Sequence, residues 1–172
     1  MNVLMSLRNY FCSVRCYIVR KGNRHADGRT PMILSIRNGK NFFVQTDSTW
    51  VYVHPNKEDQ SAINKIVGVS NNINYRINSW MVGYSYSVND NMLNIYFCEY
   101  SNKIRSSYLV KKINIGDHFI LKTNVNGGIF LDDLFIGRSK VRKSYCFLLE
   151  PRFGDKMKAP HDWKILSIIY SL

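Results

Sequence analysis

Short stretches in which apolar and polar residues alternate, separated by turn-forming residues every eight to fifteen positions, restrict the possible folds of this chain most strongly. Residues 80–88 are the clearest case. One side of a strand there would carry Trp80, Val82, Tyr84, Tyr86 and Val88, and the other side would carry Met81, Gly83, Ser85 and Ser87. Residues 93–98 alternate in the same way, so the chain is predicted to be built from strands.

About eleven such strands are predicted along the 172 residues, with no long helix. A twisted sheet of that many strands normally splits into two layers or closes on itself. The fold class is therefore predicted to be all-β, an antiparallel β-sandwich of concanavalin-like or jelly-roll type. The length fits one domain over residues 1–172, in which residues 1–46 form the basic N-terminal strands.

Three turn sequences predict hairpins. Asn38-Gly39 lies between strands expected at residues 32–37 and 42–46, and Asn and Gly tolerate the positive φ of a tight turn. Turns at residues 89–91 and 126–128 predict two more hairpins. Further strands are expected at residues 10–20, 51–53, 129–136 and 163–170, and one helical turn within residues 57–62.

Four cysteines lie at positions 12, 16, 98 and 146, too scattered for a zinc site. We interpret them as buried free thiols in a reducing compartment. No apolar stretch is long enough for a membrane span, and we find no signal peptide near the first residue. The expected location is the cytoplasm or a virion.

The net charge of +12 is unevenly placed. Residues 1–46 contain eight Lys and Arg against one Asp, residues 47–137 are balanced, and residues 138–172 contain eight against three acids. Such an excess favours an anionic partner: an acidic protein surface, nucleic acid or an acidic glycan. Uniform solubilising charge is the alternative.

Two basic blocks and one loop supply the candidate binding residues. Clustered cations suit phosphate or carboxylate groups, and nearby aromatic residues could stack on bases, although aromatic residues that alternate along a strand are more often core. Ala159-Pro160-His161-Asp162 is the best local constellation, in which His161 and Asp162 either contact a ligand or pin the loop before the last strand. The candidates are Arg15, Arg20, Lys21, Arg24 and Arg29, then Arg138, Lys140, Arg142 and Lys143, and His161 and Asp162.

Catalytic and metal-binding patterns are absent from the sequence. Asp132 and Asp133 are adjacent, so on a strand they face opposite ways and cannot act as a glycosidase pair; a hairpin or edge-protecting role fits them better. No nucleophile elbow, phosphate loop or zinc-protease motif occurs. We expect no enzyme activity, no metal and no cofactor.

Two stretches resemble a family of uncharacterised concanavalin-like or jelly-roll β-sandwich proteins from gut bacteria and their phages. The first stretch begins at residues 63–70, Ile-Asn-Lys-Ile-Val-Gly-Val-Ser, which are similar to the family's Trp-Asn-Lys-Leu-Phe-Gly-Phe-Ser. It continues at residues 78–84, which are similar to the family's Asn-Ser-x-Arg-x-Gly-Trp. Residues 151–155, Pro-Arg-Phe-Gly-Asp, and 159–165 are similar to its Pro-Tyr-Phe-Gly-Gly and Ala-Pro-His-Asp-Ile-x-Ile. The likeness covers about residues 40–170. Asn74 and Tyr75 stand where the family has paired His, Arg76 where it has Lys, and Val82 where it has Arg, so a family site built from those groups is absent or altered here.

The function predicted from the sequence is a non-catalytic binding or structural β-sandwich, encoded by a phage or mobile element, that meets an anionic partner through its basic loops. A virion-associated role, with capsid subunits or further copies of the chain as partners, suits this description. A lectin-like carbohydrate-binding module and a nucleic-acid-binding protein are the alternatives, and a polysaccharide-cleaving enzyme is a third class. Fold analogy alone does not choose among them.

Overall fold

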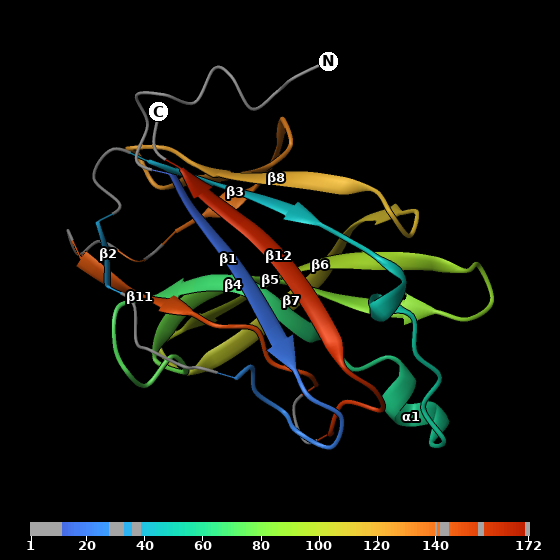
Figure 1. The fold of residues 1–172 in the computed structure, drawn as a ribbon. Helices are drawn as coiled ribbons and strands as arrows, with labels where there is room; N and C mark the ends of the chain where they lie inside the picture. Colours follow the sequence, from blue (N-terminus) through green and yellow to red (C-terminus); the bar gives the residue numbers. More distant parts are fainter. Residues whose placement is uncertain are drawn as a thin grey trace, which may run out of the picture.

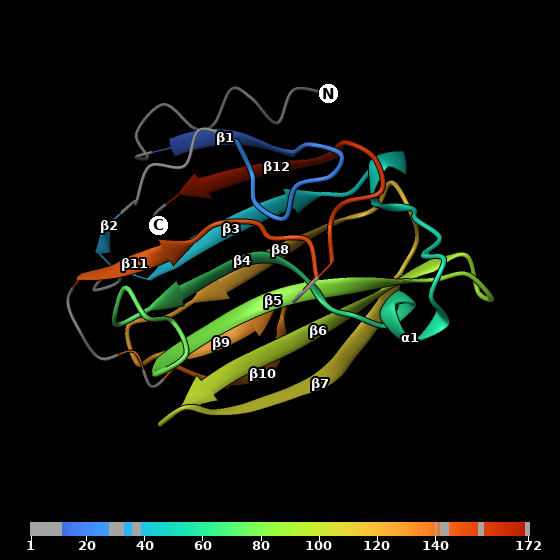
Figure 2. The same ribbon diagram turned by 90° about the horizontal axis from the view of Figure 1, so that it is seen from below.

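The computed structural model describes residues 12–27, 33–35, 39–139, 141, 145–154 and 157–170, and these form two antiparallel sheets packed face to face (Figures 1 and 2). The first sheet has the strand order β1-β12-β3-β8-β9-β10, and the second has β2-β11-β4-β5-β6-β7. The predicted β-sandwich is confirmed, and the described residues contain twelve strands rather than the eleven expected. The elements are β1 (Cys12–Val19), β2 (Ile33–Ser35), β3 (Lys40–Gln45), η2 (Ser48–Trp50), α1 (Lys57–Gln60), β4 (Asn64–Ser70), β5 (Asn78–Ser87), β6 (Met92–Ser101), β7 (Ile104–Ile113), β8 (His118–Thr123), β9 (Gly128–Leu131), β10 (Leu134–Arg138), β11 (Tyr145–Leu149) and β12 (Trp163–Tyr170).

Two of the three predicted hairpins are confirmed and one is wrong. β5 pairs with β6 and β8 pairs with β9 across the predicted turns. β2 and β3, however, belong to different sheets: β2 pairs with β11, whereas β3 pairs with β12 and β8. Gly39 has the positive φ of 70° that the Asn38-Gly39 turn required, but Asn38 lies outside the described residues and the strands on either side belong to different layers.

Two smaller predictions also need correction. The strand expected at residues 129–136 is divided into β9 and β10 by a tight turn at Asp132 and Asp133, where Asp132 has a φ of 54°. Asp132 and Asp133 therefore have the hairpin role that was one of the two roles predicted for them. Residues 51–53 are not a strand and follow the short 3-10 helix η2. The single helical turn expected near residue 60 is present as α1.

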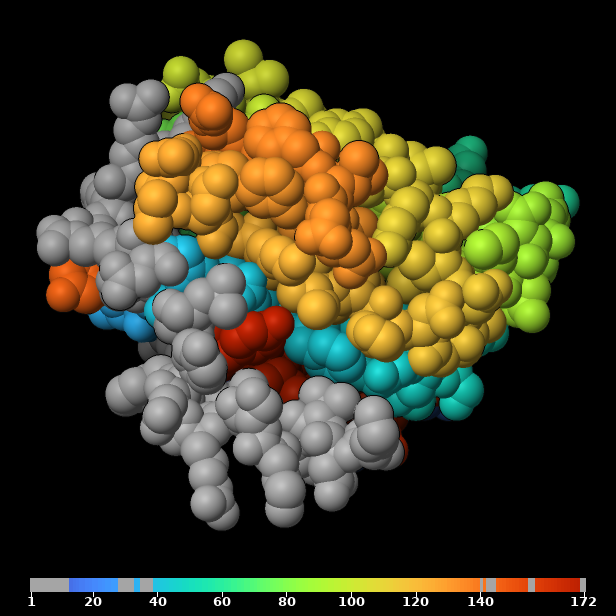
Figure 3. All heavy atoms as spheres, turned by 90° about the horizontal axis from the view of Figure 1, so that it is seen from above, coloured from blue at the N-terminus to red at the C-terminus, as the bar shows by residue number. Residues whose placement is uncertain are grey.

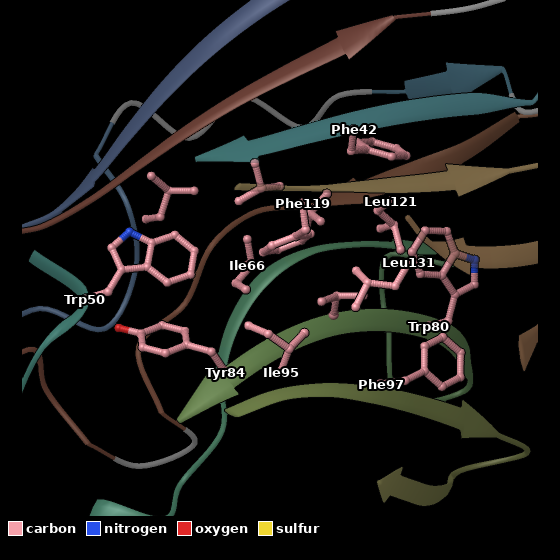
Figure 4. Packing of buried hydrophobic residues seen from close by; sticks show 14 of the residues in the cluster. Phe42, Trp50, Ile66, Trp80, Tyr84, Ile95, Phe97, Phe119, Leu121 and Leu131 are labelled. Carbon is pink, nitrogen blue, oxygen red and sulfur yellow. The ribbon is translucent and has the colours of Figure 1, made fainter. Parts of the chain in front are cut away.

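The core lies between the sheets and is formed by alternate residues of each strand. From the first sheet, Phe42, Phe119 and Leu121 point toward Ile66 and Ile95 of the second, as Figure 4 shows. Each of these side chains is at most 1% exposed. Trp80, Val82, Tyr84 and Tyr86 are buried as the alternation predicted, while Val88 is exposed at the end of the strand. The spacing of apolar residues therefore fixes which face of each strand turns inward.

A cluster of aromatic rings fills one end of the core. The ring of Trp50 lies 4.6 Å from that of Tyr84 and 5.8 Å from that of Trp163, and Phe153 packs edge-on against Trp163. The indole Nε1 of Trp50 donates a hydrogen bond to the backbone oxygen of Lys164 at 2.9 Å, which satisfies its only polar group. Trp50 thus ties η2 to the first residues of β12.

On the opposite side, the edge strands β7 and β10 of the two sheets are joined by polar contacts. Lys111 of β7 forms an ion pair with Asp132, and the hydroxyl of Tyr108 donates to the backbone oxygen of Ile136. These contacts connect the two sheets at this edge of the sandwich. Figure 3 shows β8, β9 and β10 in gold and orange beside β3 and β12 on the outer side of the first sheet.

The cysteine prediction is confirmed for two residues and wrong for one. Cys98 and Cys146 are buried free thiols, and burial raises the pKa of Cys146 to about 12. Cys16 is also free but exposed, because its side chain projects from the outer face of β1. None of the helices within the described ranges has the length and apolar character that crossing a bilayer requires.

Replacing Trp50 with Ala tests the importance of the aromatic cluster. The loss of a fully buried indole should lower the free energy of unfolding by about 3–5 kcal/mol, measured by urea denaturation. Val53→Ala, at a side chain that is 67% exposed, is the control and should change stability by less than about 0.5 kcal/mol. Equal effects of the two substitutions would contradict this account of the core.

Candidate functional site

The predicted residues near the last strand hold loops together. Arg20 donates to Asp27 at 2.9 Å and to Asp162 at 3.1 Å, and the backbone N–H of Lys21 donates to Asp162 at 2.9 Å. The hydrogen bond from Lys21 and the guanidinium of Arg20 together hold the pKa of Asp162 below its ordinary value. His161 Nε2 lies 3.0 Å from the backbone oxygen of Thr49. These contacts match the structural interpretation of His161 and Asp162; partner binding by Arg20, His161 and Asp162 stays a prediction.

The two basic blocks lie at opposite ends of the first sheet. Arg20 directly follows β1 where Val19 pairs with Trp163, and Lys21 and Arg24 are exposed beyond it. Arg138 pairs with Gly128, at the end where Cys12 pairs with Tyr170 and Lys40 with Thr123. The length of β1 separates these ends by roughly 25 Å. Within the described residues, the blocks therefore do not form one continuous basic surface; Arg29, Lys140, Arg142 and Lys143 lie outside those residues, and Arg15 is a half-buried residue of β1.

A different group of basic residues is brought together on the second sheet. Arg152 forms antiparallel bridges with Lys65 on one side and with His25 on the other. The backbone N–H groups of Lys65 and Arg152 donate to each other's carbonyl oxygens at 2.8 and 2.9 Å. Residues directly opposite in an antiparallel pair point to the same face, with Cβ atoms about 4.5–5.5 Å apart. Lys65, Arg152 and His25 thus form a row of three side chains, which we call the cationic row.

The cationic row faces outward, away from the core. Lys65 pairs with Gly83, whose neighbours Val82 and Tyr84 point inward, so Gly83 and Lys65 belong to the outer face. Lys65 is nevertheless only 6% exposed. The segments around it cover its side chain, which is unusual for a lysine.

A cavity of about 490 Å³ lies over this face, within the size range of small-molecule sites. The cationic row and Glu150 provide charged groups in its wall. Its apolar lining comes from β4, β5 and β11, which run side by side in Figure 2, and from the loop after β4. Val67, Met81, Phe147, Leu149 and Ile73 are the main contributors to that lining.

Tyr75 lies above the cationic row. The Nζ of Lys65 is 5.2 Å from the centre of its ring, and Arg152 Nη1 donates to its hydroxyl at 3.3 Å. Burial acts to raise the pKa of Tyr75, but the hydrogen bond from Arg76 and the positive charges of Lys65 and Arg152 outweigh it, so the pKa is lowered. By contrast, burial raises the pKa of Tyr52 to about 12. Tyr75 therefore stands in a positive electrostatic environment.

Local hydrogen bonds explain the position of Tyr75. The hydroxyl of Ser70 accepts from the backbone of Asn72, and the side chain of Asn74 accepts from the backbone of Arg76 at 3.2 Å, as Asn does in tight turns. The ring of Tyr75 then packs edge-on against Tyr100, with centroids 5.7 Å apart. The loop is consequently held over the outer face.

Arg152 is fixed by its neighbours in sequence. Phe153 is buried in the aromatic cluster, and its N–H donates to the backbone oxygen of Arg24 at 2.8 Å. The N–H of Gly154 donates to the side chain of Asn64 at 2.7 Å. Because adjacent residues of an extended chain point to opposite sides, burial of Phe153 directs Arg152 outward.

Lys65, Tyr75, Arg152 and His25 were not among the site residues predicted from the sequence. Backbone pairing brings His25, Lys65 and Arg152 together, and the loop after β4 places Tyr75 beside them, so residues far apart in the chain become neighbours. One signal was available: Lys65, Tyr75 and Arg152 lie within or between the stretches that carry the family resemblance. The described residues contain no group of three or more His, Cys, Asp or Glu that could hold a metal ion.

Comparison with known proteins does not assign this chain to a family. No protein-family model matches the sequence, and no curated protein does. Among solved structures, the alginate lyase from Alteromonas sp. 272 is 11% identical with a TM-score of 0.47, over 92% of this chain and 85% of that one. Alginate lyase vAL-1 from Chlorella virus is 10% identical with a TM-score of 0.46, over 96% and 88%. The carbohydrate-binding module CBM66 from Bacillus subtilis is 9% identical with a TM-score of 0.33, over 86% and 74%. All three TM-scores are below 0.5, so these likenesses carry no argument about this chain.

The titration of Tyr75 tests the electrostatics of the site. Lys65→Met removes a positive charge that favours the tyrosinate, so the pKa of Tyr75 should rise toward the ordinary tyrosine value of about 10. The measurement is a pH titration by NMR with labelled tyrosine rings. Lys164→Met, on the other sheet, removes the same net charge and should leave Tyr75 unchanged. The same pKa in both variants would show that the contact with Lys65 has no electrostatic effect.

Proposed function

We propose that this protein is a non-catalytic binding module that holds an anionic group of its partner on the cationic row. The observation that supports this proposal is the placement of three basic side chains side by side in the cationic row. Like charges placed directly opposite each other destabilise a sheet, and burial of Lys65 adds a desolvation penalty. Glu150 in the same wall supplies one opposite charge, and a bound anion supplies a second, together with hydrogen-bond acceptors, which reduces both costs further.

The predicted basic loop adjoins this site. Arg24 precedes His25 in the chain, and its backbone oxygen accepts from Phe153, next to Arg152. Lys21 and Arg24 are exposed in the segment that leads to His25, so their positive charge adds to the field that attracts an anion toward that end of the row. In this proposal the N-terminal basic block steers the partner, and the cationic row holds it.

Nucleic acid binding is less well supported by the described residues. A phosphate backbone is normally followed by a continuous basic surface, whereas Arg20 and Arg138 lie at opposite ends of the first sheet. A single pocket such as the cavity over β4 suits one anionic group better than a row of phosphates. This observation favours the pocket over an extended groove.

Titration with acetate, phosphate and glucuronate at low ionic strength tests the proposal. NMR signals of the Arg152 guanidinium and the Tyr75 ring should move on anion binding, because both groups lie at the row. Lys65→Met should weaken the binding by about tenfold or more, since hydrogen bonds to charged groups contribute about 1.5–3 kcal/mol. Lys164→Met should bind as the unaltered protein does. Shifts spread evenly over the exposed Lys and Arg residues, and equal in both variants, would contradict the proposal.

A polysaccharide-cleaving enzyme is the second candidate, and Tyr75 is the observation that favours it. A phenol with a lowered pKa beside Lys65 and Arg152 can accept a proton from a substrate whose negative charge those cations neutralise. Incubation with polygalacturonate and alginate should then shorten the chains, and Tyr75→Phe should abolish the cleavage while leaving binding intact. Unchanged chain lengths with both polymers would reject this candidate.

A further inference from the structure

The cavity over β4 is polar at one end and apolar at the other. Lys65 lies near the start of the strand, where Arg152 and His25 continue the row. Further along, Gly68 pairs with Leu149, and Ser70 pairs with Phe147. The charged groups and the farthest apolar side chain are thus about 16 Å apart along β4, which is five residues of extended chain.

The apolar part of the lining argues against sugars and bases. Val67, Met81, Phe147 and Leu149 offer no side-chain hydrogen bonds. A hydroxyl or amide placed against them would lose water without gaining a partner, which is unfavourable. An alkyl chain or an apolar ring has no such cost, and its burial there is favourable.

The charges of the lining suit a single negative charge. Apart from His25, the cavity wall contains Lys65 and Arg152 against Glu150, an excess of one positive charge. A dianion such as phosphate would leave one negative charge uncompensated beside Glu150. A carboxylate matches the excess, and its oxygens can accept hydrogen bonds from the cationic row, in which Arg152 Nη1 also donates to Tyr75.

We infer that the ligand is a small amphipathic carboxylate, whose head group contacts the cationic row and whose apolar body lies along Val67, Leu149 and Phe147. This inference rests on the proposed function and narrows it to one class of anion. Tyr75 and Ile73, in the loop after β4, cover the ligand from the solvent side. The basic loop of Lys21 and Arg24 lies beyond the head group and raises the local concentration of anions.

Binding of octanoate, octanol and acetate, followed by the methyl signal of Met81 and the ring signals of Tyr75, tests the inference. Octanoate carries both features, octanol lacks the charge and acetate lacks the apolar body. Octanoate should bind at least about tenfold more tightly than either, because each of the other two loses one group of contacts. Lys65→Met should weaken octanoate binding by about tenfold and leave octanol binding unchanged.

Ile73→Asn supplies a variant that preserves the fold, because this side chain is 86% exposed. It should weaken octanoate binding several-fold and leave acetate binding unchanged. Ile104→Asn, at a side chain that is 74% exposed on β7, is the matched control and should alter neither.

Two further probes separate the failure of this inference from failure of the proposed function. If trigalacturonate or an oligothymidylate shifts the Tyr75 and Arg152 signals while octanoate does not, the amphipathic ligand is wrong and the anion site remains. If octanol binds as tightly as octanoate, the amphipathic carboxylate is likewise wrong. If none of the anions moves these signals, the cationic row is not an anion site and both proposals are wrong.

Discussion

The packing of aromatic side chains between the two sheets is the interaction on which the rest of this structure depends. Trp50, Tyr84, Trp163 and Phe153 form one continuous set of ring contacts, and Figure 4 shows Trp50 and Tyr84 at the end of the core where it lies. The set joins η2, β5, β12 and the segment after β11. Burial of Phe153 in it also determines that Arg152 points outward, so the position of a cation on the surface follows from a ring in the core.

The fold could be predicted from the sequence wherever the determining signal is local. Alternation along residues 80–87 and 163–170 shows which side chains face the core, and the turns at residues 89–91 and 126–128 join strands that do pair. The hairpin predicted at Asn38-Gly39 was wrong because a turn residue specifies a reversal of backbone direction but does not specify which strands pair on either side. β2 pairs with β11 and β3 pairs with β12, each more than a hundred residues away in the sequence. Pairing at that separation cannot be predicted from a local sequence pattern.

The candidate site was harder to predict for the same reason. Net charge drew attention to runs of Lys and Arg, and of those with described contacts Arg20 is largely occupied with Asp27 and Asp162. The cationic row takes one residue from each of three segments, and only the segment of His25 belongs to a predicted basic block. What joins Lys65 to Arg152 is a pair of backbone hydrogen bonds, and composition contains no information about backbone pairing.

The placement of the row also bears on how selective the site can be. Lys65 belongs to a strand whose residues are all buried, and Arg152 is held by Phe153 and by the bond from Gly154 to Asn64, so both cations keep their positions before any ligand arrives. Little conformational entropy is then lost on binding at that end. Tyr75 and Ile73 belong instead to a loop closed by short polar contacts, which is easier to displace. The rigid cations therefore select strictly for the head group of a ligand. The more adaptable loop of Tyr75 and Ile73 tolerates apolar groups of different length.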